Sequence, residues 1–206
     1  MKKVVVILLA FLTVFFSACN QQKDKSPEEN PDSQVVKNEQ LSEKEVADYK
    51  AKGKEIADTT FKALSGKLQA ALAKGGVEET VKYCNINAYP LTDSLSALYN
   101  AEIKRAALKC RNPKNSLQGS EKKVYKMFDA LLSKDETLTP IVTKEKDGVH
   151  FYAPIMAKPL CLTCHGYLDT HITAENYKII KALYPDDRAV DFAEGDLRGI
   201  WSIKFN

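Results

Sequence analysis

Hydrophobic residues recur at steps of three and four along much of the first half of the chain. Such steps place side chains on one face of an α-helix, and paired glycines are typical of a helix end. The pattern therefore predicts an amphipathic helix that stops at Gly75-Gly76. Its apolar positions are Ala57, Phe61, Leu64, Leu68 and Leu72.

A second series with the same steps follows the glycine pair and contains a proline. Pro90 has no N–H to donate and crowds the preceding turn, so we expect a second helix with a kink or a restart near Tyr89. A third helix is predicted over about residues 120–132. The apolar positions are Val81, Cys84, Ala88, Leu91, Leu95 and Leu98 in the second helix, and Val124, Met127, Phe128, Leu131 and Leu132 in the third.

The second half of the chain changes to β-rich segments. Residues 138–143 and 149–155 read as strands, and Lys146-Asp147-Gly148 between them is typical of a hairpin turn. A short helix over residues 174–183 and a last strand over residues 199–205 follow. Helices followed by a small antiparallel sheet predict an α+β fold, with one domain over residues 41–206.

The N-terminus has the pattern of an export signal. Two lysines precede an apolar run over residues 4–18, which is shorter than the roughly 20 residues that a membrane-spanning helix needs. The run ends in Phe-Ser-Ala before Cys19, which resembles the lipobox of bacterial lipoproteins with phenylalanine where leucine is commoner. We expect residues 1–18 to be a lipoprotein signal peptide and Cys19 to be lipidated. The alternative is an ordinary signal peptide with an unmodified cysteine.

The segment after the export signal has the composition of a linker. Residues 20–40 contain no aromatic side chain and few apolar ones, so they cannot bury enough surface to fold. We predict a flexible tether over residues 19–40 that starts at the lipidated cysteine. The chain is then expected to be exported and lipid-anchored to the periplasmic side of a bacterial membrane.

Cys161-Leu162-Thr163-Cys164-His165 is the chemical motif with the clearest meaning. It reads C-x-x-C-H, the pattern in which two cysteine sulfurs bind haem through thioethers and the histidine becomes an axial iron ligand. A zinc site would usually need a second Cys or His pair, and a thioredoxin-type motif would need a β-α-β setting. Export agrees with haem, because bacteria attach haem c outside the cytoplasm. We predict one covalent haem c.

The net charge bears on the expected partners, and the cysteine count bears on the roles of the remaining thiols. The net charge is only +3 and the lysines are spread along the chain, so nucleic acid is not an expected partner. Of five cysteines, Cys84 and Cys110 have no role in the lipid or haem attachments. Cys84 can be a small buried hydrophobic residue, a disulfide partner of Cys110, or a thiolate ligand of the iron.

No methionine follows the haem motif, so the second axial ligand is not evident from sequence order. Met127 lies on an apolar helical stripe, and Met156 precedes Cys161 by only five positions. His171 is six positions after the motif histidine, too near to reach the opposite haem face easily, and His150 starts a predicted strand. Each of these four residues is a weaker candidate than Cys84.

Several segments in order resemble the exported c-type haem proteins with a PAS-like domain, a family catalogued as a haem-binding domain of unknown function. The resemblance covers most of the chain after the tether. It departs from the family pattern at Tyr89-Pro90, where the family usually has Ala-Pro. The segments are Val81-Lys82-Tyr83-Cys84, Ala88-Tyr89-Pro90, Leu108-Lys109-Cys110-Arg111-Asn112-Pro113-Lys114-Asn115, residues 161–166, Tyr184-Pro185-Asp186-Asp187, and Gly195-Asp196-Leu197-Arg198-Gly199.

The resemblance implies a PAS-like antiparallel sheet and a set of site residues. It implies that His165 and Cys84 are the axial iron ligands. By their place in the family segments, Arg111, Asn112 and Arg198 are candidates to bind the haem propionates. A Cys84–Cys110 disulfide stays open as the alternative, since it would remove Cys84 from the iron.

Glycines and prolines near the motif are expected to shape the backbone. Gly166 and Gly199 should allow close approach of the backbone to haem or to neighbouring strands. Pro154 and Pro159 should end the strand that precedes the motif.

The predicted function is electron transfer outside the cytoplasm, with redox proteins as partners and the membrane reached through the lipid anchor. The alternative is a haem-based redox or gas (NO or CO) sensor that acts through a separate partner. An enzyme such as a peroxidase has less support, because it needs a distal acid–base group and only His150 and His171 are candidates.

Overall fold

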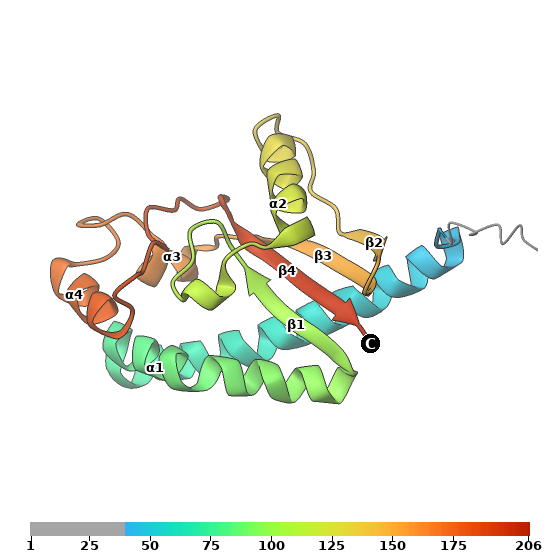
Figure 1. Ribbon diagram of the computed structural model, residues 1–206. Coiled ribbons are helices and arrows are strands. Elements are labelled where there is room, and N and C mark those ends of the chain that lie inside the picture. The colour runs from blue at the N-terminus through green and yellow to red at the C-terminus, as the bar shows by residue number, and fades with distance from the viewer. Residues whose placement is uncertain (1–39) are drawn as a thin grey trace, which may run out of the picture. The chain divides into compact units, whose positions relative to one another are not determined.

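The computed structural model describes residues 40–206, which form four α-helices and a four-stranded antiparallel sheet in the order β1-β4-β3-β2 (Figure 1). The predicted α+β fold is confirmed. The signal peptide, Cys19 and nearly all of the tether lie outside the described residues. The elements are α1 (Glu43–Tyr99), β1 (Ala101–Ala106), the 3-10 helix η1 (Pro113–Asn115), α2 (Gly119–Leu132), β2 (Ile141–Glu145), β3 (Gly148–Met156), α3 (Pro159–His165), α4 (Ala174–Leu183) and β4 (Leu197–Phe205).

Helix α1 consists of two arms that meet at Gly75 and Gly76. Both glycines depart from helical dihedral angles, and Gly76 has a φ of 63°, a left-handed value that favours glycine. The first arm begins with a capping box between Ser42 and Glu45, which satisfies two free backbone N–H groups. The predicted helix end at the glycine pair is therefore confirmed, and α1 folds back on itself (Figure 1).

The predicted helix restart near Pro90 does not occur. Only Gly75 and Gly76 leave the helical region within α1, so the second arm runs through Pro90 without a break. The proline leaves the carbonyl of Ile86 without its helical donor, but both residues are exposed. Water can therefore satisfy that carbonyl, and the helix tolerates the proline.

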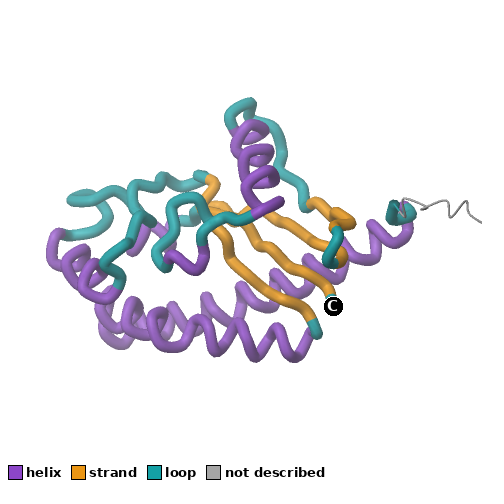
Figure 2. The backbone as a smooth tube through the Cα atoms, viewed as in Figure 1, coloured by secondary structure: helices purple, strands orange, loops and turns teal. Residues whose placement is uncertain are grey.

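The sheet is covered on both faces by helices. The arms of α1 run along one face, and α2 stands on the other (Figures 1 and 2). Successive strand residues point to opposite faces, so Phe151 and Ile203 pack against α1, whereas Tyr152 and Ile200 pack against α2. A third apolar cluster joins the second arm of α1 to α4 through Val81 and other residues. Its further buried members are Val77, Ile172, Ile180, Tyr184 and Val190.

The strands differ from the prediction at three places. Strand β1 was not expected, and β2 begins at Ile141 rather than at residue 138. Pro154 does not end β3, which continues to Met156. Strand β2 pairs with β3 only as far as Tyr152, so no β2 residue lies beside Pro154. The N–H that proline lacks is therefore not needed for a hydrogen bond to β2. Pro159 instead begins α3.

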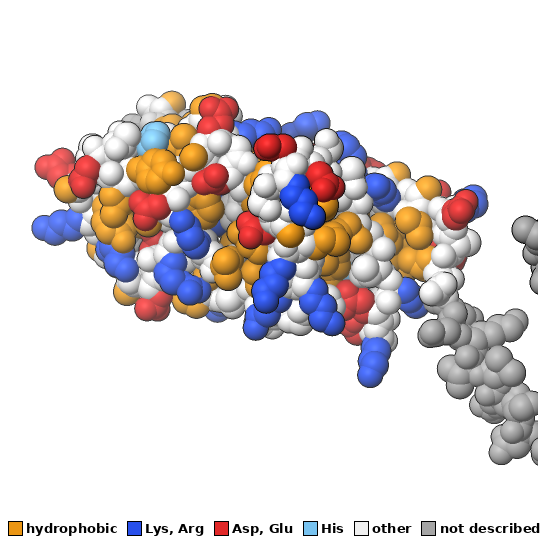
Figure 3. Space-filling view, turned by 90° about the horizontal axis from the view of Figure 1, so that it is seen from above, with side chains coloured by type: hydrophobic (Ala, Val, Ile, Leu, Met, Phe, Trp, Pro, Cys, Tyr) orange, Lys and Arg blue, Asp and Glu red, His pale blue; other side chains and the backbone are white. Residues whose placement is uncertain are grey.

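The surface of the described residues carries mixed charge. Lysine and arginine side chains alternate with acidic ones over the face seen in Figure 3, and no single sign dominates it. Among the helices between residues 40 and 206, none combines the length and the apolar character that a membrane crossing requires.

Candidate functional site

A cavity of about 530 Å³ lies at the end of the sheet where α1, β1, α3 and β4 meet. Its volume falls within the range of roughly 300–1,000 Å³ that is usual for ligand sites. The apolar stripe of the first arm of α1 continues past the sheet into this cavity, which explains why Phe61 is 40% exposed. Residues far apart in sequence therefore share one wall, and those with reactive or charged side chains are Cys84, Arg105, Cys110, Arg111, Lys158, Cys161, Cys164, His165 and Arg198.

The C-x-x-C-H motif forms the short helix α3 on one side of the cavity. Pro159 at the first turn favours the helical start, and the spacing of three puts Cys161 and Cys164 on the same side of the helix. Burial raises the pKa of the Cys164 thiol to about 11, although the charge of Arg111 acts in the opposite direction. A Cβ at Gly166 would lie 2.6 Å from Cβ of His171, and one at Gly199 would lie 2.7 Å from the backbone oxygen of Ala106 in β1, so the expected close approach to a neighbouring strand is observed at Gly199.

His165 is held in one tautomer. Its Nδ1 lies 2.7 Å from the carbonyl oxygen of Ala189, which can only accept, so Nδ1 carries the proton and Nε2 keeps its lone pair. Burial holds the pKa of His165 well below its ordinary value, and the charges of Arg198 and Arg111 lower it further. A neutral imidazole with a free Nε2 is the form that binds a metal.

Cys84 and Cys110 both line the cavity, and both are free thiols in the described part of the chain. The disulfide alternative is therefore not present in this structure. Burial raises the pKa of Cys84, while the nearby charges of Arg105 and Arg111 lower it. Cys110 is 2% exposed and accepts a hydrogen bond of 3.6 Å from the Arg188 guanidinium. Cys84 is thus the thiol with cavity-facing cations as neighbours.

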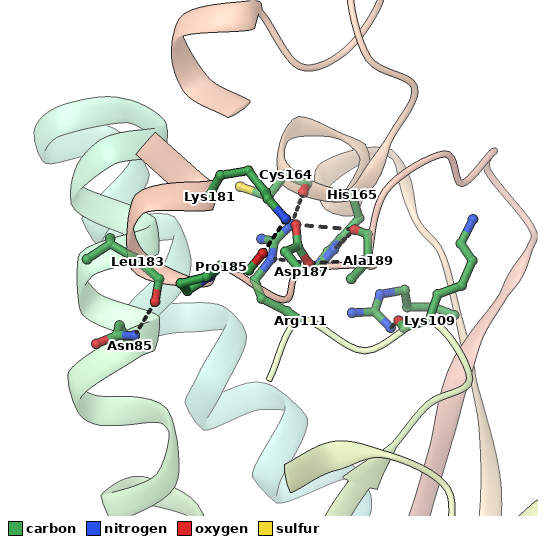
Figure 4. Close-up of polar contacts among 11 residues, drawn as sticks. Asn85, Lys109, Arg111, Cys164, His165, Lys181, Leu183, Pro185, Asp187 and Ala189 are labelled. Carbon is green, nitrogen blue, oxygen red and sulfur yellow. Dashed lines mark hydrogen bonds and ion pairs between the residues drawn. The ribbon is translucent and has the colours of Figure 1, made fainter. Parts of the chain in front are cut away.

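The three residues expected to bind propionates differ in what their donors already contact. Arg111 pairs with Asp187 through Nε and Nη2, and Nη2 also donates to backbone carbonyls (Figure 4). Asn112 caps η1 by accepting from the N–H of Lys114. Arg198 donates through Nη1 to the carbonyl of Lys109, but its buried Nε has no hydrogen-bond partner in residues 40–206.

Arg105 is a site residue that sequence reasoning missed. It lies on β1 opposite Trp201 and lines the cavity, and its charge acts on Cys84, Tyr89 and Tyr184. In the sequence, Arg105 is one arginine in a short charged segment, a pattern that is also typical of a solvated surface. Tyr89, where the family pattern usually has alanine, also lines the cavity and donates a hydrogen bond of 3.0 Å to Asn115.

The other candidate axial ligands do not line the cavity. Met127 is on α2 and is 42% exposed rather than buried, and Met156 packs beneath α2. His150 is on β3 beside Asp147, at the hairpin end of the sheet, and the ring of His171 packs near Tyr167. None of these four residues is part of the cavity wall.

A second group of potential ligands is found at the β2–β3 hairpin. Side chains of Glu145, Asp147 and His150 offer ligand atoms within 4.8 Å of one another. Glu145 already accepts hydrogen bonds from the hydroxyls of Ser120, Thr143 and Tyr152, and His150 contacts Asp147 at 3.0 Å. These partners account for the group without a metal.

The donor set around the cavity fits haem. Two thiols and a neutral imidazole lie on α3, a further thiol lies on α1, and the apolar wall matches a macrocycle. Three arginines border the cavity, whereas the described wall contains no aspartate or glutamate. Together with the unpartnered Nε of Arg198, this excess of positive charge suits an anionic group such as a carboxylate.

Comparisons with known proteins agree on one family. The model of the Tll0287-like family matches residues 22–206. The crystal structure of the cyanobacterial haem protein Tll0287 is similar, with 25% sequence identity, coverage of 72% of this chain and 91% of that chain, and a TM-score of 0.54. No curated protein matches the chain significantly. The resemblance to a haem-protein family is confirmed, and the chain belongs to the Tll0287-like family.

Proposed function

We propose that this chain is a single-haem c-type protein, tethered to a membrane by a lipid anchor, that transfers electrons outside the cytoplasm. One observation carries the proposal: the C-x-x-C-H motif and Cys84, which are about 80 residues apart, border the same cavity. Membership of the Tll0287-like family and the similarity to a haem protein support it.

Each residue of the cavity has a definite part in this proposal. Cys161 and Cys164 would bind the macrocycle covalently, and His165 and Cys84 would serve as the iron ligands. Arg198 and Arg105 neutralise the propionates, because their positive charges line a wall without carboxylates. Bound haem supplies a one-electron Fe(III)/Fe(II) couple.

Two ligand side chains at one cavity favour electron transfer over the sensing of NO or CO. Both ligands are anchored, His165 through its bond to Ala189 and Cys84 within the long second arm of α1. Two such ligands would keep the coordination of a bound iron similar in both oxidation states and would leave no open position for a gas or a peroxide. Neither His150 nor His171 lines the cavity, so neither is placed to act as a distal acid–base group.

The export signal and tether complete the proposal. Cleavage before Cys19 and lipidation of that residue would anchor the domain stably, since each buried CH₂ contributes about 0.8 kcal/mol. The tether of about 20 residues would let the domain move roughly 25 Å from the membrane between redox partners.

The test is the covalent state of the mature chain. The full-length protein is produced in a bacterium that matures c-type cytochromes, and its mass and the haem stain on a denaturing gel are measured. We expect one haem and an acylated N-terminal cysteine, followed by a reversible one-electron redox titration. Cys161→Ala with Cys164→Ala should abolish the stain, whereas the matched variant Cys110→Ala should keep it. A wild-type chain without added haem mass contradicts the proposal.

A further inference from the structure

Asp187 is a buried carboxylate that joins an arginine to a backbone amide near the haem motif. Its side chain has no exposed surface. One oxygen accepts from Nε of Arg111 at 3.2 Å and from the N–H of Ala189 at 2.9 Å, and the other accepts from Nη2 of Arg111 at 3.3 Å (Figure 4). The carboxylate therefore fixes both the guanidinium and the Ala189 amide.

The carbonyl of the same residue, Ala189, holds the imidazole. It accepts from Nδ1 of His165 at 2.7 Å and from Nη2 of Arg111 at 3.4 Å. The same Nη2 donates to the carbonyl of Cys164 at 2.5 Å. Arg111 thus contacts the backbone immediately before His165 and also the carbonyl that holds its ring (Figure 4).

We propose that Arg111 and Asp187 are positioning residues that set the ring orientation and tautomer of His165. Asp187 holds the amide of Ala189 and Arg111 holds its carbonyl, so residue 189 cannot turn away from the ring. An imidazole bound at Nδ1 directs Nε2 along one line, which is what an axial ligand needs. The inference rests on the proposed function in that Nε2 is taken to face haem iron.

The network also reduces the donors that Arg111 can offer to a propionate. Its Nε and Nη2 donors are already bound to Asp187 and to backbone carbonyls. Because both charges are buried, removal of one partner leaves the other uncompensated and loosens the Ala189 backbone. A merely stabilising ion pair would lower the melting temperature without changing the iron ligand field, so the two roles are separable by spectroscopy.

The haem-loaded full-length chain with Asp187→Asn provides the test, measured by electron paramagnetic resonance of the ferric state. We expect the single wild-type signal to broaden or split into a second species as the imidazole takes more than one orientation. Asp186→Asn is the matched control, since that neighbour is exposed and the substitution is the same. Phe128→Leu, a core change away from the cavity, controls for lowered stability alone. Both controls should keep the wild-type signal.

Two further measurements keep the inference testable if the first variant folds poorly or haem is absent. Asp187→Asn combined with Arg111→Gln removes both charges and should show the same change. In haem-free protein, ¹⁵N NMR of the three histidines, assigned with His165→Gln, should show Nδ1–H for wild-type His165 and mixed tautomers in the variant. Unchanged signals in both experiments overturn the inference. A wild-type protein without haem contradicts the proposed function. The NMR result still decides whether Arg111 and Asp187 position His165.

Discussion

Gly53 of α1 lies directly against the ring of Phe151 of β3. A Cβ placed at Gly53 would be 2.3 Å from Cγ of Phe151, a distance that real side chains do not reach. Phe151 itself has no exposed surface, and both residues belong to the contact between the first arm of α1 and the sheet. The absence of a side chain at residue 53 therefore sets how closely the helix packs on the sheet.

Gly53→Ala is expected to lower the free energy of unfolding by about 1–3 kcal/mol, because the added methyl group overpacks the core. Gly66→Ala is the matched control on the same helix. No atom lies within 4 Å of its added Cβ, so it should raise stability by about 0.5–1 kcal/mol through helix propensity. Urea unfolding followed by circular dichroism measures both. Equal effects at the two positions would contradict the packing explanation.

Cys84→Ser is expected to change the ferric absorption spectrum and to raise the midpoint potential. A thiolate stabilises Fe(III), so its loss favours Fe(II), within the roughly 0.8 V over which axial ligands tune haem. Spectroelectrochemical titration measures the shift. Cys110→Ser, at the other non-motif thiol of the cavity, should leave both properties unchanged. If Cys84→Ser behaves like wild type, Cys84 is not the ligand.

Arg198→Met is expected to affect the haem-loaded protein more than the haem-free protein. Without haem, the variant loses the hydrogen bond from Nη1 to the Lys109 carbonyl but also removes a buried Nε that has no partner in residues 40–206, so the net loss of stability is small. With haem, it removes a charge-assisted hydrogen bond to a propionate, which contributes about 2 kcal/mol. Thermal unfolding of the two forms measures the difference. Equal losses in both forms would show that Arg198 does not contact the propionate.

The reduced protein is expected to show no fast spectral change on addition of CO. The reason is that, under the proposed function, Cys84 in α1 and His165 at Ala189 would both be iron ligands on anchored side chains. Stopped-flow absorption under CO measures this directly, and Cys84→Ser supplies the comparison with one ligand removed. A rapid and tight shift in the wild type would favour the sensing alternative.

Local signals explain which parts of the fold were predicted correctly. Paired glycines and regular apolar spacing act over a few residues, so the end of the first arm and helices α2 and α4 were predicted within a residue or two. Strand β1 has an alternation too weak to be recognised, with charges at half of its six positions. It forms because β4 offers it an edge, which is a nonlocal interaction.

The sequence alone indicated a haem-binding protein, since the C-x-x-C-H motif and the family segments are readable without coordinates. Only the tertiary structure decided which residues meet. It brought Cys84 and Arg105 to the motif, left Met127 and His150 elsewhere, and paired Arg111 of the cavity wall with Asp187. The physical reason is that periodicity reports which side of an element is apolar, whereas the partner of a buried polar group depends on how elements pack.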